Sequence, residues 1–144
     1  MFNYFFDKDR DAHADTVRLF KEIAAGKYEA FTSDAVVDEL KQAPEPKNTF
    51  MLALITEYDI EVLSVGKDAE KMADLYIQQK VIPKKSRTDG VHIAVASVNG
   101  LDYIVSLNFK HIIRIKTEQM TGAANALNGY RPIQFTTPME IVTR

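Results

Sequence analysis

The chain has 144 residues, of which 46% are hydrophobic and 26% are charged, and its formal net charge is −2 at pH 7. It has no cysteine, which excludes a disulfide framework, a thiolate zinc site and a cysteine nucleophile. A net charge near zero does not by itself indicate nucleic-acid binding, although a basic stripe on one face is compatible with it.

The length is that of one domain, and we expect a single domain over residues 1–144. No apolar run approaches the roughly 18 residues that a transmembrane helix needs. The first residues lack the basic start and long apolar core of a signal peptide. We therefore expect a soluble, cytoplasmic protein without a membrane partner.

Hydrophobic periodicity predicts helices that alternate with strands along the chain. The predicted helices cover residues 12–25, 35–42, 47–57, 68–80, 87–98, 108–115, a segment near 117–127, and 138–142. The predicted strands cover residues 28–33, 59–64, 102–107 and 133–136. Strands that alternate with helices indicate an α/β fold with a parallel sheet, in which the most apolar strand, 102–107, is expected to lie inside the sheet.

The helix that ends at Val98 is apolar around almost its whole circumference, so most of it is expected to be buried. Thr88 is the expected N-cap, because its hydroxyl group can accept a backbone N–H. Asp89 then falls in the first turn, where the helix dipole favours a negative charge. A carboxylate at the start of a buried helix is a candidate metal ligand. The alternative is that Asp89 only stabilises the helix start, since acidic residues are common there.

Sites in parallel sheets form at the carboxyl ends of the strands, which makes Glu39, Asp89 and Asn108 the candidate site residues. The cations near them are Lys84, Lys85, Arg87, Lys110 and Arg114. Oxygen ligands surrounded by cations suit a hard divalent metal and a polyanionic substrate. Mg²⁺ or Mn²⁺ can activate a water molecule for attack on phosphorus. The alternative is that the cations form a solvated loop and that Glu39 is an ordinary surface residue.

Four stretches resemble, in order, the motifs of the PIN-domain family, the metal-dependent ribonucleases that include VapC-type toxins. They cover residues 32–40, 88–96, 104–111 and 129–140. The resemblance implies a three-layer α/β/α fold with a mainly parallel sheet. It places the family's second, third and fourth acidic positions on Glu39, Asp89 and Asn108. Glu39 and Asp89 would then bind the metal, with the uncharged Asn108 as a weak or outer-sphere ligand.

The start of the chain departs from the family pattern. PIN domains usually open with a hydrophobic strand that is central in the sheet and ends in a metal-binding aspartate. This chain resembles the family only from the end of that motif, so we expect the first strand to be missing or replaced. Residues 2–6 or another protein chain could take its place, and Asp7 is the candidate substitute ligand.

The resemblance implies a Mg²⁺- or Mn²⁺-dependent endoribonuclease in which water is the nucleophile and a missing first strand impairs activity. Lys84, Lys85, Arg87 and Lys110 would contact RNA. The resemblance also implies a homodimeric toxin that is restrained by a small antitoxin protein. The alternative is a non-catalytic PIN-like module that binds RNA or another protein.

Overall fold

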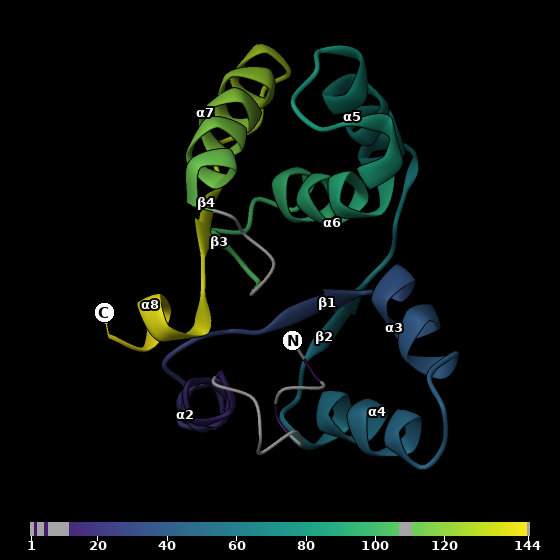
Figure 1. Ribbon diagram of the computed structural model, residues 1–144, viewed down its shortest axis with the longest axis vertical. Coiled ribbons are helices and arrows are strands. Elements are labelled where there is room, and N and C mark those ends of the chain that lie inside the picture. Colours follow the sequence, from purple (N-terminus) through teal and green to yellow (C-terminus); the bar gives the residue numbers. More distant parts are fainter. Residues whose placement is uncertain (1, 3–4, 6–11, 107–110, 144) are drawn as a thin grey trace. The chain divides into compact units, whose positions relative to one another are not determined.

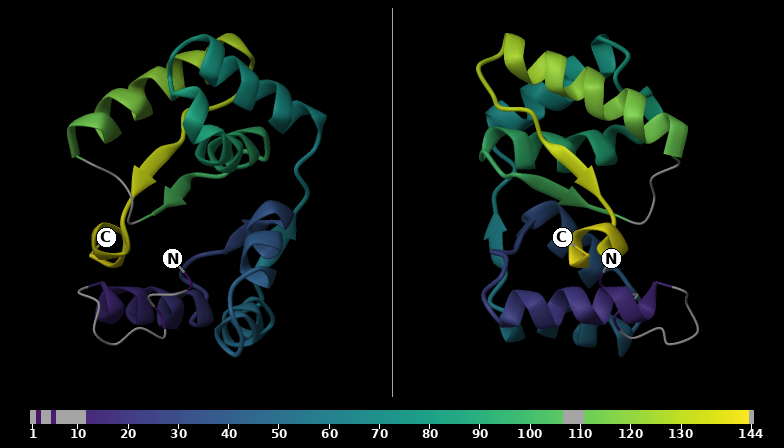
Figure 2. Two further views of the ribbon diagram at one scale, coloured as in Figure 1. Left: turned by 45° about the vertical axis from the view of Figure 1, so that its right-hand side comes forward. Right: turned by 90° about the vertical axis from the view of Figure 1, so that its left-hand side faces the viewer.

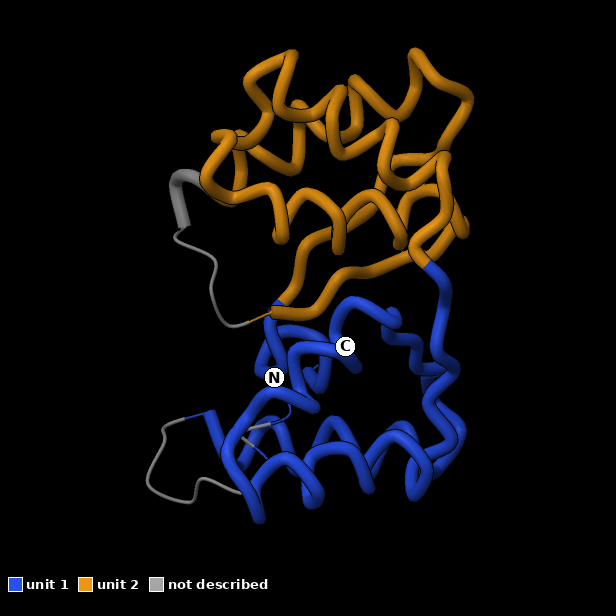
Figure 3. The backbone as a smooth tube through the Cα atoms, turned by 90° about the vertical axis from the view of Figure 1, so that its right-hand side faces the viewer, with its two compact units in different colours: residues 1–64, 137–144 blue, residues 65–136 orange. Residues whose placement is uncertain are grey.

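The computed structural model describes residues 2, 5, 12–106 and 111–143, with the backbone alone at 111–113. The described part is a mixed α/β structure that is mostly helical and has two small, two-stranded parallel sheets (Figure 1). It divides into two compact units (Figure 3). The first unit is Met1–Ser64 with Thr137–Arg144, and the second is Val65–Thr136. No described helix is long and apolar enough to cross a membrane.

The first unit has one parallel strand pair, with Thr32 opposite Val62. Its described elements are α2 (His13–Ala24), β1 (Phe31–Ser33), α3 (Asp34–Lys41), α4 (Lys47–Glu57), β2 (Glu61–Leu63) and α8 (Pro138–Val142). Helix α8 has the capping box that its sequence permits, because the Thr137 hydroxyl accepts the Glu140 N–H and the Glu140 carboxylate accepts the Thr137 N–H. The helices lie within a residue or two of the predicted ranges, whereas both strands are shorter than predicted.

Aromatic side chains from the start of the chain extend the core of the first unit. Phe20, Leu54 and Ile60 are buried, and Phe2 and Phe5 pack against them. The rings of Phe2 and Phe5 lie 6.1 and 5.0 Å from the ring of Phe20, centroid to centroid. Both residues have helical backbone, so the suggestion that residues 2–6 form a substitute strand is wrong at these two positions. Burial of the two rings against Phe20 gives these residues a place in the core that does not require strand backbone.

The second unit has the other parallel pair, with Ile104 opposite Phe135 (Figure 2). Its described elements are α5 (Lys67–Gln78), the 3₁₀ turn η1 (Lys84–Ser86), α6 (Arg87–Val98), β3 (Tyr103–Val105), α7 (His111–Leu127) and β4 (Gln134–Thr136). Helix α7 is continuous, where the sequence predicted two segments. The predicted inner strand, β3, is only half-buried and pairs with one neighbour among the described strands.

Helix α6 packs mainly on α5, and its second half is buried, as its apolar sequence predicts. Tyr76 of α5 and Asn125 of α7 are completely buried beside it. Both hydrogen-bond with Ser97 of α6. These bonds hold the three helices together around one polar centre, so the position of α6 within the second unit is well defined.

Candidate functional site

Four of the predicted site residues lie at or just before the start of α6. They are Lys84, Lys85, Arg87 and Asp89. Asp89 is exposed in the first turn of α6, while Gly90, next to it, is buried. The predicted N-cap, Thr88, is wrong: α6 begins at Arg87, and its N-cap is Ser86, whose side chain makes no capping bond. The physical reason is that η1 runs directly into α6, so the backbone is already helical before Thr88.

Two lysines precede Asp89 in the sequence by four and five positions. Lys84 and Lys85 form the exposed turn η1, so their ammonium groups can reach solvent. Arg87 is half-buried, and its guanidinium donates to the carboxylate of Asp74 on α5. Two of the three predicted RNA-contacting cations before Asp89 are therefore exposed, whereas the third already has an acidic partner.

The tight packing of Gly90 positions the loop that leads into η1. Ile82 is buried, and a Cβ atom added at Gly90 would clash with its Cδ1 atom. The glycine therefore lets Ile82 pack directly on the first turn of α6. This contact joins the residues just before η1 to the first turn of α6.

Glu39 is exposed on α3 in the first unit, whereas Asp89 belongs to the second. The end of β1 supplies the N-cap of α3, because the Ser33 hydroxyl accepts the Val36 N–H at 3.3 Å. Glu39 thus stands on a helix that directly follows a strand, as predicted. The described residues contain no group of three or more His, Asp or Glu side chains that could hold a metal ion.

Three of the predicted site residues lie outside the described residues. They are Asp7, Asn108 and Lys110. Arg114, by contrast, lies on α7 and donates a hydrogen bond to the backbone carbonyl of Phe135. Its role within the second unit is therefore to hold α7 to β4.

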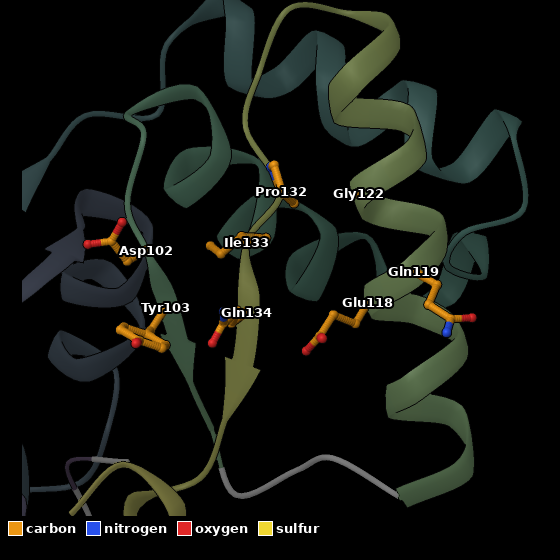
Figure 4. A pocket seen from close by; sticks show the side chains of 8 residues that line it. All are labelled: Asp102, Tyr103, Glu118, Gln119, Gly122, Pro132, Ile133 and Gln134. Atoms are coloured by element: carbon orange, nitrogen blue, oxygen red, sulfur yellow. The ribbon is translucent and has the colours of Figure 1, made fainter. Parts of the chain in front are cut away.

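A separate hollow of about 540 Å³ lies in the second unit, between α7 and the β3–β4 pair (Figure 4). Glu118 and Asp102 are its acidic lining residues. The Glu118 carboxylate accepts the Phe135 N–H at 2.7 Å, and the Asp102 carboxylate lies 3.8 Å from the Arg131 guanidinium. Both carboxylates therefore have partners within the fold. This hollow could not be read from the sequence, because its lining residues come from positions 102–134 and meet only when α7 packs beside the β3–β4 pair.

Comparison with known proteins finds no match: no protein-family model, no curated protein and no solved structure matches this chain.

Proposed function

We propose that the protein is a metal-dependent endoribonuclease of PIN type. The observation that carries this proposal is the exposed carboxylate of Asp89 on the first turn of a largely buried helix, directly after the exposed lysines of η1. A carboxylate oxygen suits Mg²⁺ or Mn²⁺, and neighbouring ammonium groups suit the phosphates of RNA.

The division of the strands supports the PIN-like fold. The opening strand of PIN domains is central in the sheet. A PIN-like sheet that lacks this strand would therefore consist of two separate parallel parts. The described strands form two such pairs, β1 with β2 and β3 with β4. We therefore propose that residues 1–144 form one PIN-like domain with the three-layer arrangement.

In the proposed site, Glu39 and Asp89 supply the carboxylate ligands, and Asn108 adds an amide oxygen. Their donor atoms fit a hard divalent ion, because all are oxygens. Bound Mg²⁺ or Mn²⁺ would supply an activated water molecule and neutralise charge on the phosphate. Lys84 and Lys85 hold the RNA backbone, with Lys110 as a further contact. Arg87 joins them when RNA phosphate replaces Asp74 as its partner.

The cellular setting is part of the proposal. The resemblance supports a cytoplasmic toxin that acts as a homodimer and is restrained by a small antitoxin protein. RNA would be its substrate, and Mg²⁺ or Mn²⁺ its cofactor.

Cleavage of RNA by the purified protein tests the proposal. Wild type is expected to cleave with Mg²⁺ or Mn²⁺ and to stop with a chelator. Asp89→Asn is expected to lower the cleavage rate at least about a hundredfold, since even residues that only support a metal ligand matter 10–100-fold. Asp68→Asn is the matched control, because Asp68 is also exposed in the first turn of a helix in the second unit. Cleavage that survives both Asp89→Asn and chelator contradicts the proposal.

A second measurement addresses whether Glu39 and Asp89 share one ion. Mn²⁺ broadens the NMR signals of amides near it, so it is expected to broaden those of Leu40 and Gly90 at the same low concentration. Broadening of only one of them contradicts a shared ion.

The alternative function predicts a different result. If the protein binds RNA without cleaving it, and if Asp89→Asn binds RNA as tightly as wild type, a non-catalytic binding module is favoured instead.

A further inference from the structure

An ion pair joins α5 to the first residue of α6. The Arg87 guanidinium donates a hydrogen bond to the carboxylate of Asp74. Within the described part of the chain, this carboxylate is the acidic partner of Arg87. Both residues belong to the second unit, in which α5 and α6 pack on each other. The pair therefore lies directly after η1, the turn that carries Lys84 and Lys85.

The ion pair is open to solvent. The side chain of Asp74 is 67% exposed and that of Arg87 is 42% exposed. An exposed ion pair contributes little to stability, because water and salt screen the attraction between its charges. A phosphate group that approaches from solvent can therefore reach the guanidinium, and separating Asp74 from Arg87 costs little free energy.

Asp74 cancels part of the positive charge at the proposed RNA contact. Lys84, Lys85 and Arg87 place three cations within four consecutive residues, and the carboxylate of Asp74 is bonded to one of them. A carboxylate and a phosphate both bind a guanidinium through their oxygens. Two anions on the same guanidinium repel each other, so the binding of phosphate to Arg87 is opposed by Asp74.

We infer that Asp74 competes with RNA phosphate for Arg87 and so lowers the affinity of the protein for RNA. Asp74 holds the guanidinium in the free protein, and a phosphate takes its place in the complex. A phosphate can accept two parallel hydrogen bonds from the guanidinium, which favours this exchange. The inference rests on the proposed function, because it requires that Arg87 contacts RNA.

Binding of single-stranded RNA in chelator, followed by fluorescence anisotropy, tests this role without metal-dependent cleavage. Asp74→Asn removes the charge and is expected to bind RNA about two- to fivefold more tightly than wild type, the range that an exposed ion pair allows. Asp68→Asn is the matched control, because it removes the same charge from another exposed position on α5. Asp68 lies about 9 Å from Asp74 along the helix axis, beyond the screening length of about 8 Å at physiological salt. Its RNA affinity is therefore expected to stay near that of wild type.

The Arg87→Ala background shows whether Asp74 acts through Arg87. In this background, Asp74→Asn is expected to change the RNA affinity no more than Asp68→Asn does, because the shared guanidinium is gone. An equal gain from Asp74→Asn in both backgrounds would mean that Asp74 acts through overall charge, and it would overturn the inference. Weaker RNA binding by Asp74→Asn would also overturn it, since Asp74 would then orient Arg87 toward RNA. Should Asp74→Asn fail to fold, Asp74→Ala is measured in the same comparisons.

The outcomes separate this competition from the proposed nuclease activity. Tighter RNA binding by Asp74→Asn, without cleavage by wild type in Mg²⁺ or Mn²⁺, would support the competition and contradict the nuclease. Metal-dependent cleavage by wild type, with equal RNA affinity of wild type and Asp74→Asn, would support the nuclease and overturn the competition. Absence of RNA binding by wild type and by every variant would overturn both.

Discussion

The hydroxyl oxygen of Tyr76 lies 2.5 Å from the side-chain oxygen of Asn125, and both residues are completely buried. The amide group of Asn125 donates to the Ser97 hydroxyl at 2.9 Å and to the Arg131 carbonyl at 3.1 Å. The Tyr76–Asn125 contact therefore joins α5 to α7 and, through Ser97, to α6. Because the side chains of Tyr76, Ser97 and Asn125 are buried, removal of one of them leaves another polar group without its partner and lowers the stability of the second unit.

Tyr76→Phe is expected to lower the free energy of unfolding by about 1–3 kcal/mol, because the oxygen of Asn125 loses its donor inside the protein. Urea unfolding followed by circular dichroism measures this loss. Tyr58→Phe is the control, since it removes a phenol hydroxyl from the first unit, which does not contain the network. Equal stability of Tyr76→Phe and wild type would show that the network contributes nothing.

The same tyrosine gives the protein a predictable response to alkaline pH. Burial raises the pKa of Tyr76 above its ordinary value of 10.0, and hydrogen bonds with Ser97 and Asn125 act in the opposite direction. The folded state therefore holds the phenol proton more tightly than the unfolded state does. This contribution to stability is complete below pH 10.0 and is lost as the pH rises through the raised pKa.

Wild type is accordingly expected to lose free energy of unfolding more steeply above pH 10 than Tyr76→Phe does. Urea unfolding at a series of pH values measures both slopes. The comparison between the two proteins removes the contribution of the other tyrosines and the lysines, which both share. Equal slopes in wild type and Tyr76→Phe would contradict the assignment of the steeper loss of stability to Tyr76.

Gly90 and Ile82 are expected to be energetically coupled. Gly90→Ala gains helix propensity but forces the buried Cδ1 atom of Ile82 to move, and overpacking of this kind costs about 1–3 kcal/mol. Ile82→Val removes Cδ1 and keeps Cγ1, which would lie 3.6 Å from the new methyl group, an ordinary contact. Gly90→Ala is therefore expected to be less destabilising in the Ile82→Val background than in wild type, by roughly 1 kcal/mol.

A double-mutant cycle from urea unfolding measures this coupling. If Gly90→Ala costs the same in both backgrounds, the Cδ1 contact is not the cause of the destabilisation. The cycle also measures packing next to the proposed site, because Ile82 comes shortly before η1 in the sequence and Gly90 directly follows Asp89.

The helices were largely predictable from the sequence, because their signals are local. Apolar spacing and proline placed the helices over 47–57 and 138–142 at the observed bounds. The range of α6 was also predicted as observed, whereas its N-cap was missed, since nothing in the residue types before Arg87 distinguishes a 3₁₀ turn from a loop. The strands were predicted too long, because a strand ends where its partner ends, and each described ladder is only three residues long.

The candidate site was predictable only in its local part. The order of residues from Lys84 to Asp89 was sufficient to place the lysines and the carboxylate at one helix start. The ion pair of Arg87 with Asp74 and the bond of Glu118 with the Phe135 N–H could not be read from the sequence. They join residues 13 and 17 positions apart, so they depend on how whole helices pack. The relation of Glu39 to Asp89 is likewise a property of the tertiary structure and not of the local pattern.

The lysines of η1 make a prediction that uses the salt dependence of RNA binding. In chelator, which prevents metal-dependent cleavage, the logarithm of the binding constant for single-stranded RNA is expected to fall linearly with the logarithm of salt concentration. Each lost phosphate contact reduces that slope by about 0.7 for a single strand, so Lys84→Ala/Lys85→Ala is expected to reduce it by roughly 1.4. Lys67→Ala/Lys71→Ala removes the same charge from exposed positions on α5 and is expected to leave the slope unchanged. Fluorescence anisotropy titrations at several salt concentrations measure all three slopes, and an equal reduction in both variants would mean that RNA responds to net charge and not to η1.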